Sequence, residues 1–253
     1  MDWPRIKKMR KFLKDYDREE VDFDATDQAR KVPMPDIQKP WTGEDPVALP
    51  RAEDLELPGM TVAEAIAKRR SRRVFQAQEM KLEELSYLLW ATGGIRSQRP
   101  YRILRNTPSA GNRHSEETYL AVFRVKGLKQ GIYRYLPLEH QIGLVAEYPD
   151  LYDRVNRAAR MQLFASRCNV LFLWTSIPYR TEWRYDFASA KVIALDMGHI
   201  CQNLYLACES IGYGTCAVAA YDQDQADALL GIDGEEEFTV YMAPVGVQDP
   251  NEQ

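Results

Sequence analysis

The stretch NVLFLWTS, residues 169–176, decides the fold of this 253-residue chain. It contains an unbroken apolar run from Val170 to Trp174, which has the length of a strand and is too short for a helix of several turns. A strand with one solvent-exposed face alternates apolar and polar side chains, whereas a strand covered on both faces is apolar throughout. The run therefore predicts a central, fully buried strand.

Segments on both sides of this run supply the rest of a sheet and its helices. Residues 118–125 and 131–136 are rich in β-branched and aromatic side chains and flank the turn KGLKQ, which predicts a hairpin. Residues 215–221 and 237–246 predict two more strands. Helical patterns cover residues 61–71, 82–92, 149–165, 188–211 and 222–231. Together these elements predict an α+β fold with at least five strands.

The N-terminal part of the chain has a different composition. Six prolines lie between residues 31 and 59, and such a density excludes long helices and central strands. We expect an extended arm there, preceded by a short helix around residues 5–17. The chain is therefore divided into an extended N-terminal arm, residues 1–60, and a domain of residues 61–253.

Composition excludes several classes of function. A formal net charge of −4 and a pI of about 5.6 argue against a surface that neutralises nucleic-acid phosphates. The apolar runs fall far short of the roughly 20 residues that span a bilayer, and the N-terminus lacks an apolar signal segment. We expect a cytoplasmic protein that binds neither nucleic acid nor membrane. Four cysteines without a C-x-x-C pair are expected to be core residues, and three dispersed histidines predict no metal site.

Two polar motifs are ambiguous when each is taken alone. The run RRSRR, residues 69–73, is typical of a solvated last helical turn, where cations complement the helix dipole. The segment PSAGN, residues 108–112, is typical of a turn. Two further motifs follow in order, DMGHICQNLYLACESIGYGT at residues 196–215 and YMAPVG at residues 241–246.

The four motifs in this order resemble the nitroreductase superfamily of FMN-dependent oxidoreductases. The combination of PSAGNRH, GIYRYLPLEH and D-x-G-H-x-x-Q-N-L resembles its SagB-type azoline dehydrogenase branch. The resemblance covers about residues 61–246. It implies a central, mainly antiparallel sheet flanked by helices, in a homodimer that holds FMN at the subunit interface.

The resemblance also implies which residues contact FMN. Matched phosphate and ribityl contacts are Arg69, Arg70, Ser71 and Arg73, and arginine forks suit a phosphate well. Arg72 occupies the variable position of the motif and is expected to face solvent.

Further matched positions surround the flavin ring. Pro108, Ser109 and Ala110 are expected where the backbone approaches the ring edge, Asn112 and Arg113 on its ribityl or pyrimidine side, and Gly214, Ala219 and Ala220 in the segment near N5 and O4. The resemblance places this last segment across the subunit interface from the Arg69–Arg73 run. Many relatives carry Glu-Gly where this chain has Ala219 and Ala220, and the late basic pair of classical nitroreductases is missing here.

Flavin chemistry needs no side-chain acid or base, and the sequence offers no recognisable catalytic triad or carboxylate pair. Where azoline dehydrogenases carry a Lys-Tyr pair, this chain has Arg184 and Tyr185, which could act on the substrate side or be a surface pair. The helix at 188–211 could pack against a copy of itself or be an ordinary core helix.

We expect an enzyme that transfers a hydride from NAD(P)H through FMN to an electron-poor small-molecule acceptor, of the nitroaromatic or quinone type. One alternative is an azoline dehydrogenase that acts on a modified peptide. Another is a flavin-binding protein without turnover.

Overall fold

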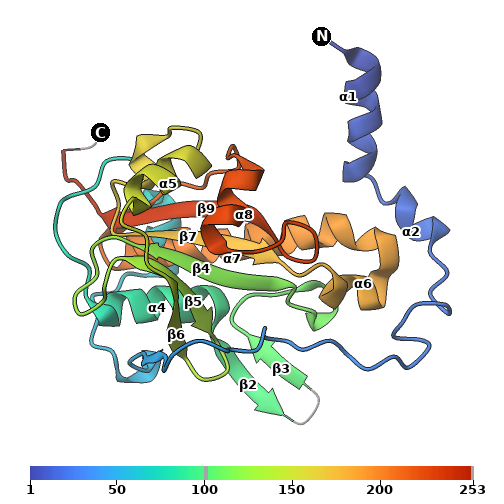
Figure 1. Ribbon diagram of the computed structural model, residues 1–253, viewed down its shortest axis with the longest axis horizontal. Helices are drawn as coiled ribbons and strands as arrows, with labels where there is room; N and C mark the ends of the chain where they lie inside the picture. Colours follow the sequence, from blue (N-terminus) through green and yellow to red (C-terminus); the bar gives the residue numbers. More distant parts are fainter. Residues whose placement is uncertain (100–101, 252–253) are drawn as a thin grey trace.

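The computed structural model describes residues 1–99 and 102–251, and its core is a seven-stranded antiparallel sheet (Figure 1). In spatial order the strands are β1 (Val47–Ala48), β6 (Gln141–Ala146), β5 (Gly131–Leu136), β4 (Glu116–Val122), β7 (Val170–Ser176), β9 (Phe238–Val247) and β8 (Tyr213–Thr215). β7 pairs with β4 on one side and with β9 on the other. The predicted central strand is thus confirmed, as are the α+β class and the hairpin of β4 and β5.

Helices cover both faces of this sheet. α4 (Leu82–Gly93) and α7 (Ser189–Ser210) pack on one face, and α5 (Leu151–Ala158) and α8 (Gln223–Leu230) pack on the other. The remaining helices are α1 (Trp3–Met9), α2 (Tyr16–Glu20), α3 (Val62–Lys68) and α6 (Tyr179–Tyr185). Short 3-10 helices lie at Arg10–Leu13, Ala52–Asp54, Ala110–Asn112, Leu163–Ala165 and Asp186–Ala188.

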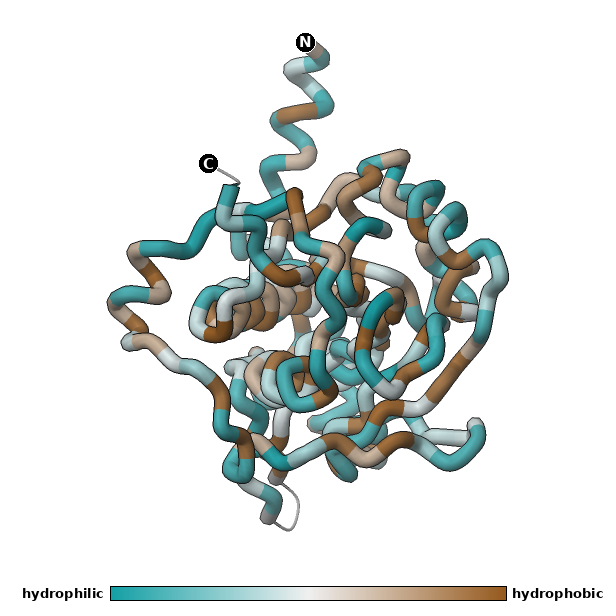
Figure 2. Tube along the Cα trace, turned by 90° about the vertical axis from the view of Figure 1, so that its left-hand side faces the viewer, coloured by the Kyte–Doolittle hydropathy of each residue, from teal (hydrophilic) through white to brown (hydrophobic). Residues whose placement is uncertain are grey.

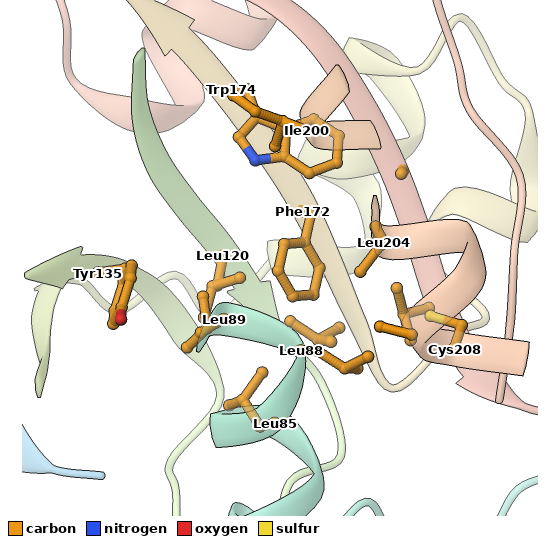
Figure 3. Close-up of a cluster of buried hydrophobic side chains, with 14 of the residues drawn as sticks. Leu85, Leu88, Leu89, Leu120, Tyr135, Phe172, Trp174, Ile200, Leu204 and Cys208 are labelled. Atoms are coloured by element: carbon orange, nitrogen blue, oxygen red, sulfur yellow. The ribbon is translucent and has the colours of Figure 1, made fainter. Parts of the chain in front are cut away.

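The side chains of β7 divide between the two layers because successive residues of a strand point to opposite faces. Val170, Phe172 and Trp174 belong to the core under α4 and α7. Figure 3 shows Phe172 among leucines of both helices, Leu88 of α4 and Leu204 of α7. Leu171 and Leu173 belong to the core under α5 and α8. All five are fully buried, and full burial of one such side chain contributes about 1.5–3 kcal/mol.

Several predicted bounds change in the structure. The helix expected over residues 149–165 ends at Ala158, because Arg160 and Met161 adopt left-handed backbone angles, with φ of 51° and 61°. The strand expected over residues 215–221 is wrong: β8 ends at Thr215, and the following segment makes a single bridge, Val218 to Met242. The strand β6 and the hairpin of β2 (Ile95–Arg99) and β3 (Arg102–Arg105) were not predicted, since arginine-rich β2 and β3 lack a clear alternation.

The N-terminal arm begins with α1 and α2, and Figure 2 shows the N-terminal helix α1 extending clear of the rest of the chain. α2 lies closer to the body, where its Arg18 stands 5.6 Å from the centre of the Tyr185 ring. The expected helix around residues 5–17 is broken into α1, a 3-10 turn and α2. The later part of the arm crosses the body: the Lys39 amide donates to the Glu117 carboxylate at 2.7 Å, and Arg134 donates to the Pro40 carbonyl at 2.8 Å. In the part of the chain that the structure describes, no helix is long and apolar enough to span a membrane. All four cysteines are buried free thiols, which confirms them as core residues.

The arginine run at residues 69–73 is extended and is not the last turn of a helix. α3 begins with a capping box of Thr61 and Glu64 and ends at Lys68. The chain then runs beside β8, and the Arg72 amide donates to the Thr215 carbonyl at 2.9 Å. Extended backbone turns alternate side chains to opposite sides.

Arg72 is therefore the buried member of the run, which corrects the expectation that it faces solvent. Its stem lies on Gly214, where an added Cβ would come within 2.6 Å of the arginine Cδ. Its guanidinium pairs with Glu209 of α7 at 3.5 Å, and both side chains are less than a tenth exposed. The pair ties the segment after α3 to the long helix.

Replacement of Arg72 by alanine should destabilise the protein, because Glu209 would remain buried without its partner. Loss of one member of a buried ion pair costs about 3–5 kcal/mol, measurable as a lower urea midpoint. Arg70→Ala, at an exposed neighbouring position, is the control and should change the midpoint little. Equal midpoints for the two variants would contradict the structural role of Arg72.

Candidate functional site

The loop of residues 107–113 is held against α7 by a single carboxylate. Asp196 accepts a hydrogen bond from the Ser109 hydroxyl at 2.7 Å and another from the Ala110 amide at 3.0 Å. Burial raises the pKa of Asp196, and the bond from Ser109 opposes that rise. The clamp fixes the loop by its polar groups and leaves Pro108 exposed.

A buried acid lies beneath this loop. Glu116 accepts from the Arg105 guanidinium at 3.2 Å and lies 3.2 Å from Nδ1 of His114, whose other nitrogen lies 3.2 Å from the Asn112 side-chain oxygen. The Asn112 amide group in turn donates to the Ile103 carbonyl at 2.7 Å. Asn112 has a positive φ of 57°, so this network holds a turn that most side chains would avoid.

Helix α6 brings the predicted substrate-side residues onto the same loop. At Gly111, which also has a positive φ of 57°, an added Cβ would lie 2.7 Å from Cδ of Arg184 and 2.7 Å from the hydroxyl of Tyr185. Only glycine allows this close approach without displacement of the two side chains. The PSAGN motif and the Arg184–Tyr185 pair, at least 72 residues apart in sequence, are therefore in contact.

The N-terminal arm supports α6 from its other side. The Gln28 amide donates to the Trp183 carbonyl at 2.9 Å, and the Trp183 indole donates to the Val32 carbonyl at 3.0 Å. The Gln28 side chain accepts from Arg184 at 3.1 Å. Residues 28–32 of the arm thus help to orient a residue of the candidate site.

The hairpin of β2 and β3, the loop that follows it and Arg184 of α6 line a pocket of about 710 Å³. Its lining consists of Arg96, Leu104, Arg105, Asn106, Thr107, Pro108, Ser109, Gly111, Asn112, Arg113 and Arg184. Five of the sequence-predicted site residues, Pro108, Ser109, Asn112, Arg113 and Arg184, therefore share one cavity, whose volume falls in the usual range of small-molecule sites.

Apart from Ala110 and Tyr185, which belong to the pocket loop and its contacts, the remaining predicted residues lie near the other end of α7 as a second group. The Ser71 hydroxyl lies 2.9 Å from that of Tyr205, and the Arg69 guanidinium lies 5.3 Å from the centre of the Tyr205 ring. Arg73 lies over the ring of Phe164, at 5.8 Å. The Ala220 carbonyl accepts from Gln162 at 2.7 Å, two residues before Phe164.

The contacts of this second group are formed within one chain, and the expectation that the arginine run and the Ala219–Ala220 segment lie on opposite sides of a subunit interface stays a prediction. Ser71 bridges Thr215 directly. Arg70, Ser71, Arg73, Ala219 and Ala220 are exposed, Arg69 is partly exposed, and Gly214 is buried under Arg72. The Ala219–Ala220 backbone is accessible to a ligand.

The two groups lie on opposite edges of α7. Asp196, which holds the pocket loop, and Tyr205, which contacts Ser71, are nine residues apart, or two and a half turns and about 14 Å of helix. The helix face between them is exposed at Ala194, Leu195 and Gly198, and Leu195 is 54% exposed. Nothing in the described structure lies within 4 Å of a Cβ built at Gly198.

Sequence reasoning missed the residues that hold these groups in place. Asp196 and Tyr205 both lie within the quoted DMGHICQNLYLA motif, and a polar residue among the apolar positions of a helix was the available signal for Asp196. Trp183 and Gln28 gave no comparable signal, because their contacts join distant segments.

The family model of the nitroreductase family matches residues 66–247, so the chain belongs to that family. A protein of Methanocaldococcus jannaschii that is named as a nitroreductase is 28% identical over 200 residues, which cover 79% of this chain and 95% of that protein.

Solved structures share the fold. A nitroreductase structure from Ralstonia eutropha JMP134 has a TM-score of 0.68 at 23% identity and covers 84% of this chain and 93% of its own. A chain of the E. coli microcin synthetase McbBCD complex with truncated pro-MccB17 bound has a TM-score of 0.60 at 16% identity, and the match covers 96% of this chain and 94% of that chain. The NADPH:FMN oxidoreductase of Vibrio harveyi complexed with NAD⁺ has a TM-score of 0.54 at 16% identity, and the match covers 76% of this chain and 70% of that chain.

The buried acid under the pocket loop should give the protein a defined acid sensitivity. Burial opposes the charge of Glu116, but the His114 hydrogen bond and the Arg105 charge outweigh it and hold its pKa at about 2. Because the folded pKa lies below the unfolded value, the ionised group stabilises the fold above about pH 4.5. That contribution, on the order of 3 kcal/mol, is lost as the pH falls toward 2.

Urea unfolding measured from about pH 6 to about pH 3 tests this expectation. Glu116→Gln cannot titrate and should flatten that part of the profile. Glu53→Gln, whose side chain is 68% exposed, should keep the parental slope. Parallel profiles for the parent and Glu116→Gln would show that another group controls acid unfolding.

Proposed function

We propose that this protein is an FMN-dependent oxidoreductase that takes a hydride from NAD(P)H and passes it to a small electron-poor acceptor of the nitroaromatic or quinone type. Family membership supports an oxidoreductase in general. The observation that carries the finer proposal is that the PSAGN loop and Arg184 line one pocket, with Tyr185 in contact with the same loop at Gly111.

The residues present fit FMN. Arg69, Arg70 and Arg73 offer cationic donors for a phosphate, and the exposed backbone of Ala219 and Ala220 offers amide donors for a ring edge. The pocket loop keeps its own polar groups bonded to Asp196, so its exposed surface at Pro108 can lie against a planar ring. The NADPH:FMN oxidoreductase among the similar folds acts, by its name, on FMN.

The arrangement favours a site shared between two copies. Within one chain Ser71 is held at Tyr205 and Ser109 at Asp196, and these two positions lie about 14 Å apart along α7 and on opposite edges of that helix. The exposed face of α7 between them, with Leu195 at 54%, and the exposed Val62 and Ile66 of α3 give an apolar surface for a second copy. We propose a homodimer in which each FMN contacts the arginine run of one copy and the PSAGN loop of the other.

The hydride chemistry is supplied by FMN when it is bound. The protein's task is to orient the ring, exclude water and stabilise negative charge. In this proposal Arg184, which lines the pocket, and the adjacent Tyr185 act on the substrate side, and the Arg184 guanidinium holds a substrate by charge. Arginine stays protonated, so it is a poor general base.

An azoline dehydrogenase is the second candidate function, favoured by one observation. The microcin synthetase chain covers 96% of this chain, including the N-terminal arm. Abstraction of a proton from an azoline ring needs a base, and the Lys-Tyr pair of such enzymes is Arg184 and Tyr185 here. The third candidate, a flavin binder without turnover, predicts FMN binding but no reduction by NAD(P)H.

The flavin content and the oligomeric state of the purified protein together test the shared site. The purified protein should be yellow, with about one FMN per chain, and Leu195→Asp should lose both the dimer and the flavin because it puts a charge into the interface. Met161→Asp, 63% exposed on the far layer, is the control. Colourless parental protein that takes up no added FMN would rule out the flavin function, and a monomer with full FMN would rule out the shared site.

Tyr185→Phe distinguishes the two catalytic candidates. Flavin reduction by NAD(P)H needs no side-chain base, so stopped-flow reduction should change by only a few-fold. Loss of a general base typically lowers a rate by about 10²- to 10⁴-fold. Tyr179→Phe, at the exposed start of α6, controls for the helix. A loss of about a hundredfold or more at Tyr185 alone, with FMN retained, would overturn the base-free mechanism.

A further inference from the structure

The candidate pocket is unusually rich in arginine. Four of its eleven lining residues are Arg96, Arg105, Arg113 and Arg184, and none of the eleven is acidic. Arg105 is neutralised by Glu116 at 3.2 Å. Within residues 1–99 and 102–251, no carboxylate lies within ion-pair distance of the other three arginines.

Neutral groups hold two of these guanidinium groups in place. Arg184 donates to the side-chain oxygen of Gln28 at 3.1 Å, and Nε of Arg113 donates to the Gly111 carbonyl at 3.1 Å. Arg113 also lies over the Trp183 ring, 5.1 Å from its centre. These contacts orient the charges without cancelling them, and each guanidinium keeps further N–H donors.

The two charges lie close enough to disfavour each other. Arg113 is partly buried, and its pKa is lowered first by that burial and then by the positive charge of Arg184. The chain as a whole is acidic, with a net charge of −4, so the cluster is a local feature. A bound anion would offset both the burial and the repulsion.

We propose that this pocket binds the anionic group of a substrate, a carboxylate or a phosphate, between Arg113 and Arg184, with the exposed Arg96 as a third cation. The inference rests on the proposed function and specifies its substrate class. Arginine forks bind planar carboxylates and phosphates by paired hydrogen bonds, and the cavity of about 710 Å³ suits a small molecule.

The anion has two possible sources in this reaction, an acid group on the acceptor or the 2′-phosphate of NADPH. Two matched pairs of substrates distinguish them. One pair is 4-nitrobenzoate with neutral 4-nitrobenzamide, and the other is NADPH with NADH. The measured quantity is the ratio of kcat/KM within each pair, because a ratio cancels general losses of activity.

In the parent one ratio should favour the anionic member, and Arg113→Gln should lower that ratio by about 10- to 100-fold, the range for charged hydrogen bonds. Arg96→Gln should lower it less, and Arg113→Lys should retain part of it. Arg157→Gln, half-exposed on α5, is the control and should leave both ratios unchanged. A change in the acceptor ratio assigns the anion to the acceptor, and a change in the dinucleotide ratio assigns it to NADPH.

Calorimetric titration of the purified protein with benzoate and with benzamide gives a readout that needs no turnover. Benzoate should bind the parent, bind Arg113→Gln about tenfold or more weakly, and bind better than benzamide. If benzoate binds to protein that carries no flavin, the anion site stands and the proposed function fails. A different outcome is that the protein holds FMN, Arg113→Gln changes neither ratio and benzoate does not bind. In that case the proposed anion site is wrong and the proposed function stands. A fall in FMN content with unchanged ratios would assign Arg113 to the cofactor and also overturn the proposal.

Discussion

The burial of β7 on both faces is the constraint on which the rest of the molecule depends. A strand with Phe172 and Trp174 on one face and Leu171 and Leu173 on the other must have a packed layer on each side. α7 provides the largest part of one layer, and its apolar face against the sheet fixes its rotation about its own axis. That rotation decides which residues of α7 remain at its edges. The position of the candidate site is therefore a consequence of the core.

α7 acts as the reference frame for both halves of the site. One edge presents Asp196 to the PSAGN loop, and the opposite edge presents Tyr205 to Ser71. The face between them carries Leu195 and Gly198 and is open to solvent. A helix that packs one face on a sheet and leaves small residues on the other is suited to close approach by a second copy. The proposed cofactor site therefore depends on the proposed dimer.

Arginines in this chain fall into two environments with different consequences. Arg72, Arg105 and Arg180 are buried and paired with glutamates, and each pair joins two different segments of the fold. Arg113 and Arg184 line the pocket and are held by a carbonyl, an amide oxygen and aromatic rings. Paired charges contribute to the fold, whereas oriented charges without a carboxylate partner are available to a ligand. The N-terminal arm contributes to the second environment, because the Gln28 side chain accepts a hydrogen bond from Arg184 and holds it in place.

The sequence by itself determined the central strand, the long helix and the family, because each depends on local periodicity or on an ordered set of motifs. It also identified Pro108, Ser109, Asn112, Arg113 and Arg184, which the fold brings into one cavity. Only the tertiary structure decided the direction of Arg72, which follows from pairing with Thr215 and the space above Gly214. It likewise decided that Asp196 clamps the loop and that Gln28 and Trp183 support the pocket. These contacts join residues that are far apart in the chain. The packing of the whole core decides which of them become neighbours, and no local sequence pattern encodes that choice.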